Sequence, residues 1–461
     1  MWNHRIGVLS TLAVLLFSVP SFADSRARIV RLSYVEGDVQ IDRNTGQSFE
    51  KAFLNVPLIQ GARLRTGFNG FAEVEFEDGS TLRLTSGTQV SFPQLELRES
   101  GAKASTADLQ RGMVYVSFAG TKHKDDEFAL TFGPGTAALA TPVHFRLEME
   151  KAKASLAVFK GDLEVNGPSG VAMAGSKETL NFDLTDHDQY RLAKKVEEAP
   201  YDAWDKEQDD YRQRYARNNA WTNSPSVYGL SDLGYYGSFF NVAGYGMMWQ
   251  PFFVGAGWDP FMDGAWAWYP GVGYSWVSAY PWGWAPFHYG AWQYLAGYGW
   301  VWQPGGTWAG LSNPLRTLNP PVGFKPVQPP ATPVRSLVVV SRGAASAAAP
   351  TADGIRIRNN SAGLGIPRGS LGNLNRMSVH VEQRGFATAT FLNPPAAAMY
   401  NPAISGSSVR GATAPEWSAA TRSTPVNQPS ASPQGMAAPS FHAGSASASG
   451  GSHGSGGARG K

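Results

Sequence analysis

The octet GYGMMWQP at residues 244–251 returns as GYGWVWQP at residues 297–304, and this repeat constrains the fold more than any other feature. The pattern Gly-x-Gly-x-x-Trp also occurs at residues 271–276, so its copies are 27 and 26 residues apart. Between them, GWDPFMDGAW at 257–266 and GWAPFHYGAW at 283–292 agree at seven of ten positions. Because units this short cannot bury an apolar face alone, neighbouring units must share one core.

The repeat predicts an aromatic module over residues 228–312, built from short strands or extended arms joined by Gly and Pro turns. Gly permits tight turns, Pro interrupts strand ladders, and a packed indole buries about 150–250 Å². Thirteen of the fifteen Trp residues lie between Trp204 and Trp308. A nucleotide-binding loop is disfavoured, since no apolar strand precedes the Gly-x-Gly motif and no helical pattern follows it.

The indoles of this region have two interpretations. They are its only large apolar mass and could form its core, or some could form an exposed platform for sugar rings or quaternary amines. The candidate ligand-binding residues of the second interpretation are Trp258, Trp266, Trp284, Trp292 and Trp300. Nucleic acid is disfavoured as a ligand because residues 228–308 contain no Lys or Arg. The spacing is loosely similar to that of choline-binding and other cell-wall-binding modules, which implies a cell-wall polysaccharide as partner.

Residues 1–23 have the pattern of a secretory signal peptide, with a basic start, an apolar run over 6–19 and small residues at Ser21 and Ala23. The alternative is an uncleaved membrane anchor, but that run is shorter than the about 20 residues a span needs. The chain has no Cys, which excludes disulfides, thiolate metal sites and lipid attachment through Cys. We therefore expect export to the periplasm or outer cell envelope, with no membrane span after cleavage.

Residues 24–192 are predicted to be an all-β domain, either a sandwich of short strands or a solenoid-like roll. In FAEVEFEDGSTLRL, residues 71–84, apolar and charged residues alternate with the period of a half-buried strand. Keeping the two faces separate requires a three-residue turn, Asp-Gly-Ser, that pairs Phe76 with Leu82 and has its Gly at positive φ. Glu75 would then lie opposite Arg83.

A second pattern, Gly-x-Val/Leu-x-Val/Ile, occurs at residues 37–41, 112–116 and 161–165. Asp follows the Gly in the first and third copies, which indicates equivalent turns at the start of equivalent strands. This spacing is typical of stacked short strands in an all-β fold.

These segments resemble the FecR-type periplasmic domain of bacterial envelope proteins over about residues 29–182. The matching stretches are YVEGDVQI at 34–41, PLIQGARLRTGFNGFAEVEFEDGSTLRL at 57–84 and VFKGDLEV at 158–165. The resemblance implies a periplasmic signalling role. Regulators of this family carry a cytoplasmic helical segment that holds a sigma factor, whereas here only five residues precede the apolar run. Members also commonly show Gly-Thr where this chain has Thr-Pro-Val-His-Phe at 141–145.

Residues 201–221 are predicted to form an amphipathic helix that docks as a strut between domains. Trp204, Tyr211 and Tyr215 fall at helical spacing, with charged residues at the other positions. Asp202 is a candidate N-terminal cap.

From residue 313 to 461 the chain is rich in Pro, Ala, Ser and Gly, which predicts a mostly disordered tail. Alternating apolar residues at 336–341 and 377–391 are two exceptions that could add strands to a neighbour. Residues 309–461 have a net charge of +10, against −8 for residues 24–308. The basic tail could attract anionic envelope polymers or lipid headgroups, or it could serve only for solvation.

The sequence contains no recognisable active site. His123, His144, His187 and His288 stand alone without metal-ligand spacing, and no nucleophile elbow or phosphate loop occurs. We expect no enzymatic activity, cofactor or metal. The sequence predicts an exported, non-catalytic envelope protein that acts as a binding or scaffolding module. The alternatives are a glycan or cell-wall binder and a periplasmic component of a cell-surface signalling system, either with an envelope protein as partner.

Overall fold

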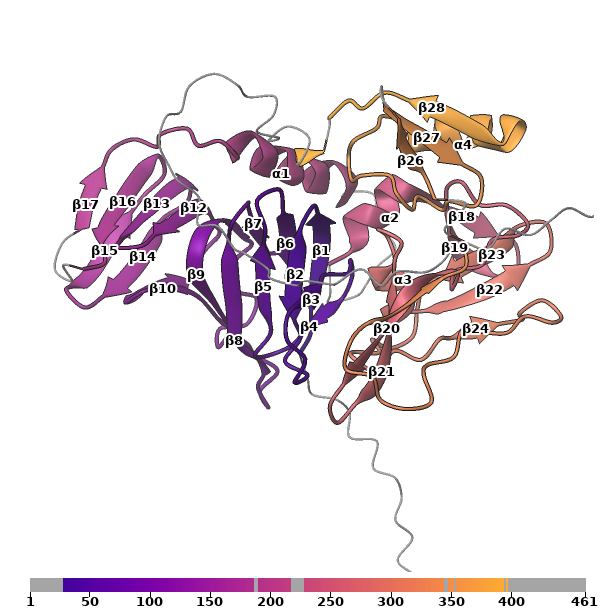
Figure 1. The fold of residues 1–461 in the computed structure, drawn as a ribbon, viewed down its shortest axis with the longest axis horizontal. Helices are drawn as coiled ribbons and strands as arrows, with labels where there is room; N and C mark the ends of the chain where they lie inside the picture. The colour runs from indigo at the N-terminus through magenta and orange to yellow at the C-terminus, as the bar shows by residue number, and fades with distance from the viewer. Residues whose placement is uncertain are drawn as a thin grey trace, which may run out of the picture. The chain divides into compact units, whose positions relative to one another are not determined.

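A computed structural model describes residues 28–185, 190–216, 228–343, 347–351, 354–393 and 395–396 (Figure 1). Strands account for 44% of the structure and helices for 11%, which confirms the mainly β fold class. The signal-peptide prediction, His187 and the tail beyond residue 396 lie outside the described residues. Within the described ranges, no helix combines the length and the hydropathy of a membrane span.

Seventeen strands build the N-terminal domain, which comprises residues 28–193. They are β1 (Val30–Glu36), β2 (Val39–Asp42), β3 (Glu50–Lys51), β4 (Pro57–Leu58), β5 (Arg63–Thr66), β6 (Phe71–Glu75), β7 (Thr81–Leu84), β8 (Gln89–Leu97), β9 (Lys103–Phe118), β10 (Glu127–Phe132), β11 (Gly135–Leu139), β12 (Val143–Glu150), β13 (Lys153–Lys160), β14 (Leu163–Gly167), β15 (Gly170–Ala174), β16 (Glu178–Asp183) and β17 (Tyr190–Ala193). Their buried aliphatic residues form one core.

Strand β9 belongs to two sheets and joins them. Its first half pairs with β8 and β10, and its second half pairs with β7 and β12. The change falls at Gly112, which has φ of 90° and leaves no room for a side chain, because a Cβ would lie 2.6 Å from the Cα of Thr88. Gly112 therefore lets one strand bend from one sheet into the other.

The other two copies of the Gly pattern begin equivalent strands, as predicted. Gly37 and Gly161 have φ of 68° and 87°, and β2 and β14 each start two residues later. Both positions are left-handed turns that favour Gly.

The β6–β7 hairpin has the predicted three-residue turn with Gly at positive φ. The Phe76 N–H donates to the Ser80 carbonyl at 2.9 Å, the Gly79 N–H donates to the Phe76 carbonyl at 3.0 Å, and Gly79 has φ of 91°. The turn is thus Glu-Asp-Gly rather than Asp-Gly-Ser, because Gly must occupy the third loop position in this turn type.

The register of the hairpin differs from the predicted one by two residues. Val74 lies opposite Leu82 and Glu73 opposite Arg83, so the prediction that Phe76 pairs with Leu82 is wrong. A shift of two keeps every side chain on its face. The face assignments therefore stand although the pairs change.

Helix α1 (Asp202–Ala216) confirms the predicted helix for the described part of residues 201–221. Trp204 and Tyr211 are buried, as the spacing indicates. Asp202 does not cap the helix amides, because its carboxylate accepts hydrogen bonds from Arg146 and Tyr115 of the N-terminal domain.

The aromatic module extends over residues 228–343, further than the predicted 228–312. Its elements are α2 (Leu230–Tyr236), β18 (Gly237–Val242), β19 (Gly246–Pro251), β20 (Asp263–Tyr269), β21 (Gly273–Ser278), α3 (Trp284–His288), β22 (Ala291–Leu295), β23 (Gly299–Gln303), β24 (Thr317–Leu318) and β25 (Val338–Ser341). Strand β25 pairs with β20, which confirms the strand predicted at 336–341. Strand β24 pairs with β22, so residues past 312 complete these sheets.

Each Gly-x-Gly motif is the tip of a hairpin, and each following Trp returns opposite another aromatic residue. The facing pairs are Trp249 with Phe239, Trp276 with Trp266, and Trp302 with Trp292. All three tips have both Gly residues at positive φ. The repeat therefore encodes three hairpins that each bury an aromatic pair.

The two octets recur because their hairpins contact each other reciprocally. Trp249 of β19 pairs with Trp302 of β23. The Gln250 side chain donates to the Tyr298 carbonyl at 2.8 Å, and the Gln303 side chain donates to the Tyr245 carbonyl at 3.1 Å. Each Trp-Gln-Pro segment thus holds the Gly-Tyr-Gly tip of the other copy.

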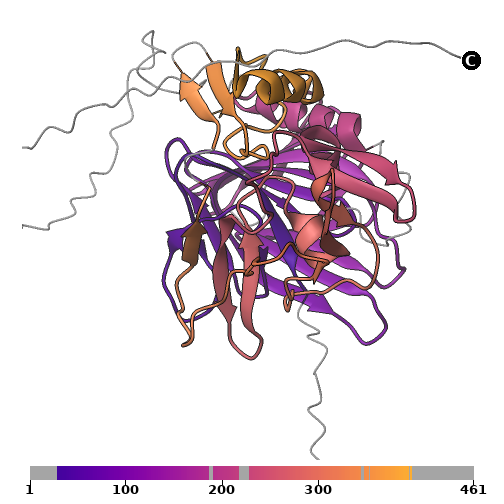
Figure 2. The same cartoon turned by 90° about the vertical axis from the view of Figure 1, so that its right-hand side faces the viewer.

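Residues 347–393 form a C-terminal subdomain of β26 (Ala349–Thr351), β27 (Gly354–Arg358), α4 (Leu374–Arg384) and β28 (Phe386–Ala389) (Figures 1 and 2). The expectation of disorder from residue 313 is therefore wrong for this part of the tail. Ile355, Leu374 and Val381 are buried in the same core as the indoles, which supplies the apolar contact that composition did not reveal. Of the predicted strand at 377–391, the first half is helix and only the second half is strand.

Candidate functional site

The five Trp residues predicted as a ligand platform are buried. Their exposed fractions are 3% for Trp258, 6% for Trp266, 0% for Trp284, 1% for Trp292 and 3% for Trp300. The structure thus contradicts an exposed platform and agrees with the core interpretation. The physical reason is that the indoles are the largest apolar side chains of these short hairpins, so their rings pack edge to face, as Trp258 does on Trp292 at 5.8 Å.

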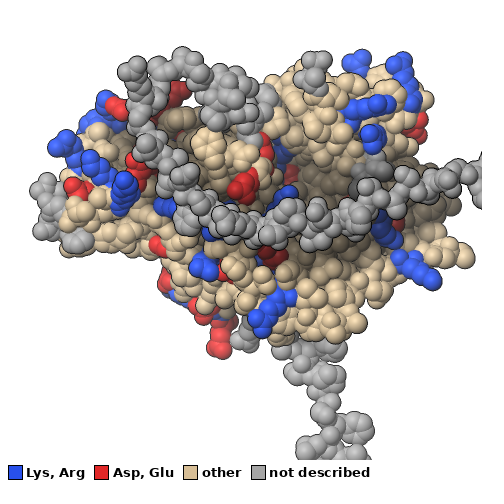
Figure 3. Space-filling view, in the orientation of Figure 1, with Lys and Arg blue, Asp and Glu red and all other residues tan. Residues whose placement is uncertain are grey.

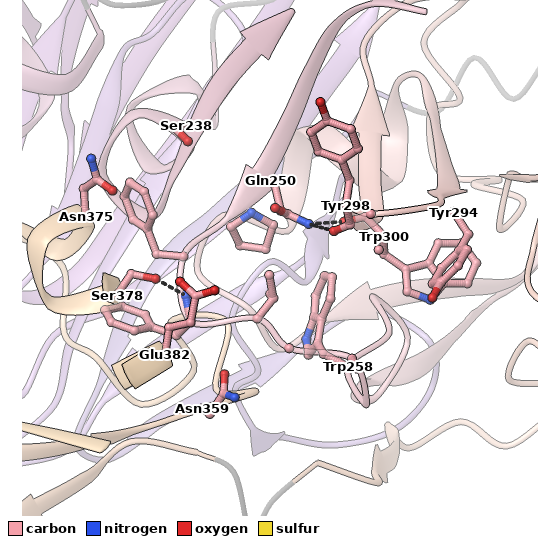
Figure 4. A pocket seen from close by; sticks show the side chains of 18 residues that line it. Ser238, Gln250, Trp258, Tyr294, Tyr298, Trp300, Asn359, Asn375, Ser378 and Glu382 are labelled. Atoms are coloured by element: carbon pink, nitrogen blue, oxygen red, sulfur yellow. Dashed lines mark hydrogen bonds between the residues drawn. The ribbon is translucent and has the colours of Figure 1, made fainter. Parts of the chain in front are cut away.

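Two of these residues, Trp258 and Trp300, line a cavity of about 500 Å³ (Figure 4). Its wall combines β19, residues 252–256, the tip of the β22–β23 hairpin and helix α4. In Figure 4 the rings of Tyr298, Trp300 and Tyr294 lie on one side, and polar side chains of α4 lie on the other. This volume falls within the range of about 300–1,000 Å³ that is typical of small-molecule sites.

The backbone of the cavity wall is held by side chains. Gln250 donates to the carbonyls of Tyr298 and Trp300 at 2.8 and 3.0 Å. Phe253 has φ of 63°, which is unusual for a bulky residue, and its N–H donates to the Ser378 hydroxyl at 3.1 Å. Helix α4 therefore fixes a strained turn at the cavity, a feature often found at binding sites.

The residues that line this cavity all lie in the described ranges, and Glu382 is the one Asp, Glu, Lys or Arg among them. Its side chain is exposed. In Figure 3 charged side chains lie over the N-terminal domain and over the C-terminal subdomain, while the visible surface of the aromatic module is mostly uncharged. The cavity thus combines aromatic rings and neutral polar groups with one carboxylate.

A buried ion cluster joins α1 and the C-terminal subdomain to the N-terminal domain. The Glu73 carboxylate lies 2.8 Å from Arg83, 3.0 Å from Arg212 and 2.8 Å from Arg368, and its side chain is fully buried. Burial alone would raise the pKa of Glu73, but Arg212, Arg368 and Arg83 hold it well below its ordinary value. Glu73 therefore stays ionised and attracts three cations at once.

The same cluster continues into the aromatic module through Asp232 of α2. Asp232 lies 2.6 Å from Arg31 and 3.1 Å from Arg368, and Arg31 also lies 3.0 Å from Glu75. Burial opposes ionisation of Asp232, yet Arg368 and Arg31 lower its pKa. Strand β1, helix α2 and residue 368 are thus held by one set of charges.

His144, Asp205 and Asp209 place ligand atoms within 4.8 Å of one another and could hold a metal ion. However, Arg83 donates to Asp205 at 2.5 Å and to Asp209 at 2.6 Å, while His144 Nε2 lies 2.7 Å from the second Asp205 oxygen. A cation would have to compete with Arg83 for both carboxylates. The group is better described as an ion-pair network that docks α1.

Two regions of the chain match models of known protein families. Residues 62–164 match the model of the FecR protein family. We refer to the N-terminal domain, which contains this match, as the FecR-type domain. Residues 230–331 match a second model, described as a family of unknown function (DUF6600), which covers most of the aromatic module.

Two crystal structures of a candidate anti-sigma factor from Parabacteroides distasonis ATCC 8503 are similar to this chain, with 15% and 14% identity and a TM-score of 0.25. Each match covers 29% of this chain and 59% of the other. The chain thus spans less than two thirds of the length of those proteins. Among curated proteins, none matches the chain.

Sequence reasoning missed both the ion cluster and the α4 wall of the cavity. Glu73 and Glu75 alternate with apolar residues, which indicates a solvent-facing strand edge, yet both are buried. Their partners Arg212 and Arg368 lie 139 and 295 residues away from Glu73. No periodicity links residues so far apart, so only the folded chain reveals these pairs.

Proposed function

We propose that this protein is a non-catalytic binding and scaffolding component of a cell-surface signalling system, exported to the cell envelope. The FecR match supports the signalling role, and the pattern of residues 1–23 supports export. One observation carries the proposal. The aromatic module, which contains the cavity, is packed directly on the FecR-type domain, so both can respond to one ligand.

The contact between these regions is buried and specific. The Tyr269 hydroxyl donates to the Pro57 carbonyl at 2.7 Å, and the Asn55 side chain donates to the carbonyls of Ser278 and Tyr280 at 3.0 and 2.8 Å. Tyr269 also belongs to the aliphatic core of the FecR-type domain. A ligand that stabilises the module should therefore stabilise its neighbour too, as linkage requires.

The chemistry of the cavity supports binding rather than catalysis. Among the residues that line it, Ser238 and Ser378 carry hydroxyl groups, but there is no His or Lys that could activate them. The Ser378 hydroxyl accepts a hydrogen bond from the Phe253 N–H, which assigns it a structural task.

The test is deletion of the gene in the native host, followed by measurement of all transcripts. We expect a small group of genes under one alternative sigma factor to change, and the full chain to restore them. A version that lacks residues 1–23 should fail to restore them because it is not exported. Unchanged transcripts would contradict the signalling role, and restoration by the shortened version would contradict export.

A further inference from the structure

We propose that the cavity between β19, the tip of the β22–β23 hairpin and α4 binds a saccharide that carries free amino groups. This inference rests on the proposed binding function and names the class of ligand. It differs from a platform of exposed indoles, since only Trp258 and Trp300 of the five candidates line the cavity, and both are already packed.

The aromatic side of the cavity presents rings at different angles. Trp300 packs edge to face against Tyr294, with centroids 5.8 Å apart, and Tyr298 stacks on Phe240 at 5.6 Å. Tyr298 remains 49% exposed although it is large and largely apolar. The apolar C–H face of a sugar ring would cover such a ring, while its hydroxyl groups remain free for polar partners.

The opposite side offers those polar partners. Asn359, Asn375 and Ser378 line the cavity there, and their amide and hydroxyl groups suit the hydroxyl groups of a sugar (Figure 4). The Ser378 and Asn359 oxygens already accept from the N–H groups of Phe253 and Asn360, so a flat apolar ligand would leave the hydroxyl and amide donors of this side unused, which is unfavourable. A polyhydroxyl ligand satisfies both sides.

The charge of the cavity selects among saccharides. Glu382 is its one carboxylate, and no Lys or Arg lines it. Residues 228–308 also contain no Lys or Arg, so the hairpin side of the cavity offers no cation to an acidic sugar, and Arg376 and Arg384 of α4 are not among the residues that line it. A protonated amine would gain from Glu382, whereas a uronic acid or phosphate would be repelled.

The repeat supplies a matched control for this site. Tyr245 and Tyr298 occupy the same position in their octets, and each carbonyl accepts a hydrogen bond from the Gln of the other octet. Their exposed fractions, 46% and 49%, are nearly equal. Of the two, only Tyr298 lines the cavity. Comparing removal of its ring with removal of the Tyr245 ring therefore distinguishes a lost ligand contact from a general effect on the hairpins.

The test is calorimetric titration of the full chain with three tetramers, made of glucosamine, N-acetylglucosamine or galacturonate, at a pH where the amines are protonated. We expect saturable binding of the glucosamine tetramer, weaker binding of the acetylated one and none of the acidic one. Tyr298→Ala should weaken binding about tenfold, as the loss of one ring contact predicts. Tyr245→Ala should leave it unchanged, and Glu382→Gln should remove the preference for free amines.

Absence of saturable glucosamine binding would overturn the proposal, as would equal weakening by the two Tyr substitutions. If Glu382→Gln kept the amine preference, the assignment of the amine would be wrong. If the glucosamine tetramer does not bind but deletion of the gene changes transcripts, only the ligand class is rejected. Binding without any transcript change would reject only the signalling role.

Discussion

The FecR-type domain and the aromatic module are both built from short strands, but different kinds of side chain stabilise them. The first buries aliphatic side chains between two sheets and buries charged residues on the face that meets α1. The second has no Lys or Arg in residues 228–308 and packs indoles within and between its hairpins. The contrast shows that aromatic pairs hold the hairpins of the module together, as Trp249 and Trp302 do, whereas buried charges here attach one region to another, as Glu73 and Arg368 do. Different perturbations should therefore weaken each region, although both unfold together because they share buried contacts.

The largest effect is expected in the aromatic module, from loss of one ring at the contact between octets. Trp302 is fully buried and its indole N–H donates to the Tyr289 carbonyl at 2.8 Å. Trp302→Ala should lower the free energy of unfolding by about 5 kcal/mol, the upper end for a large buried ring. Urea unfolding measures this. A loss below about 1 kcal/mol would show that the indoles are not the core.

The corresponding change in the FecR-type domain removes a charge rather than a ring. Glu73→Gln leaves Arg83, Arg212 and Arg368 without their shared partner, so the free energy of unfolding should fall by about 3–4 kcal/mol. The control is Glu127→Gln, which breaks the exposed pair with Arg98 and should change little. Equal effects of the two substitutions would contradict a buried role for Glu73.

The two regions should lose stability in different pH ranges, because the buried group that resists protonation differs between them. Burial lowers the pKa of His288 to about 4, whereas the unfolded side chain titrates near its ordinary 6.5. Between these values the unfolded state binds more protons than the folded state. The free energy of unfolding therefore decreases as pH falls from 6.5 toward 4. The loss should be about 2 kcal/mol at pH 5.

Unfolding at pH 8 and pH 5 should show that loss in the native chain and much less of it in His288→Gln. Glu73 acts at lower pH, because its folded pKa lies well below the ordinary 4.5. Its contribution is present above 4.5 and is lost only as pH falls through that folded pKa. If His288→Gln kept the full pH dependence, the titrating group would lie elsewhere.

The smallest effect is expected at the hairpin tip that lies outside the cavity. Tyr245 is half exposed, so Tyr245→Ala should change the free energy of unfolding by less than about 0.5 kcal/mol. The Gln303 contact uses the backbone carbonyl of this residue and survives the substitution. A loss above about 2 kcal/mol would mean that the tips themselves hold the octets together.

Much of the fold follows from local sequence. Alternation predicted the strands, and Gly spacing predicted the turns at Gly37 and Gly161 and the hairpin tips, because backbone sterics act within a few residues. The register of β6–β7 was wrong by two residues because face parity cannot distinguish such shifts. The ordered subdomain of residues 347–393 was missed because its few apolar side chains pack against indoles far away in sequence.

The candidate site was less predictable than the fold. Trp258 and Trp300 were named from the repeat, but the cavity also needs Ser378 and Glu382 from residues 377–391, where alternation predicted a strand and the segment instead begins with the end of helix α4. The ion cluster depends on Arg368, which no local pattern distinguishes from other Arg residues of the basic tail. Long-range pairing of charges and cavity walls requires the folded chain.

Because the FecR-type domain and the aromatic module share buried contacts, they should unfold as one unit. Residues 28–185 contain no Trp, so Trp emission reports mainly on the module and α1, while amide hydrogen exchange can follow β1 and β6 directly. Both signals should be recorded on the full chain across a urea series. The buried Trp emission and the exchange protection of β1 and β6 should be lost at the same urea concentration. Complete loss of the buried Trp emission while β1 and β6 stay protected would contradict it.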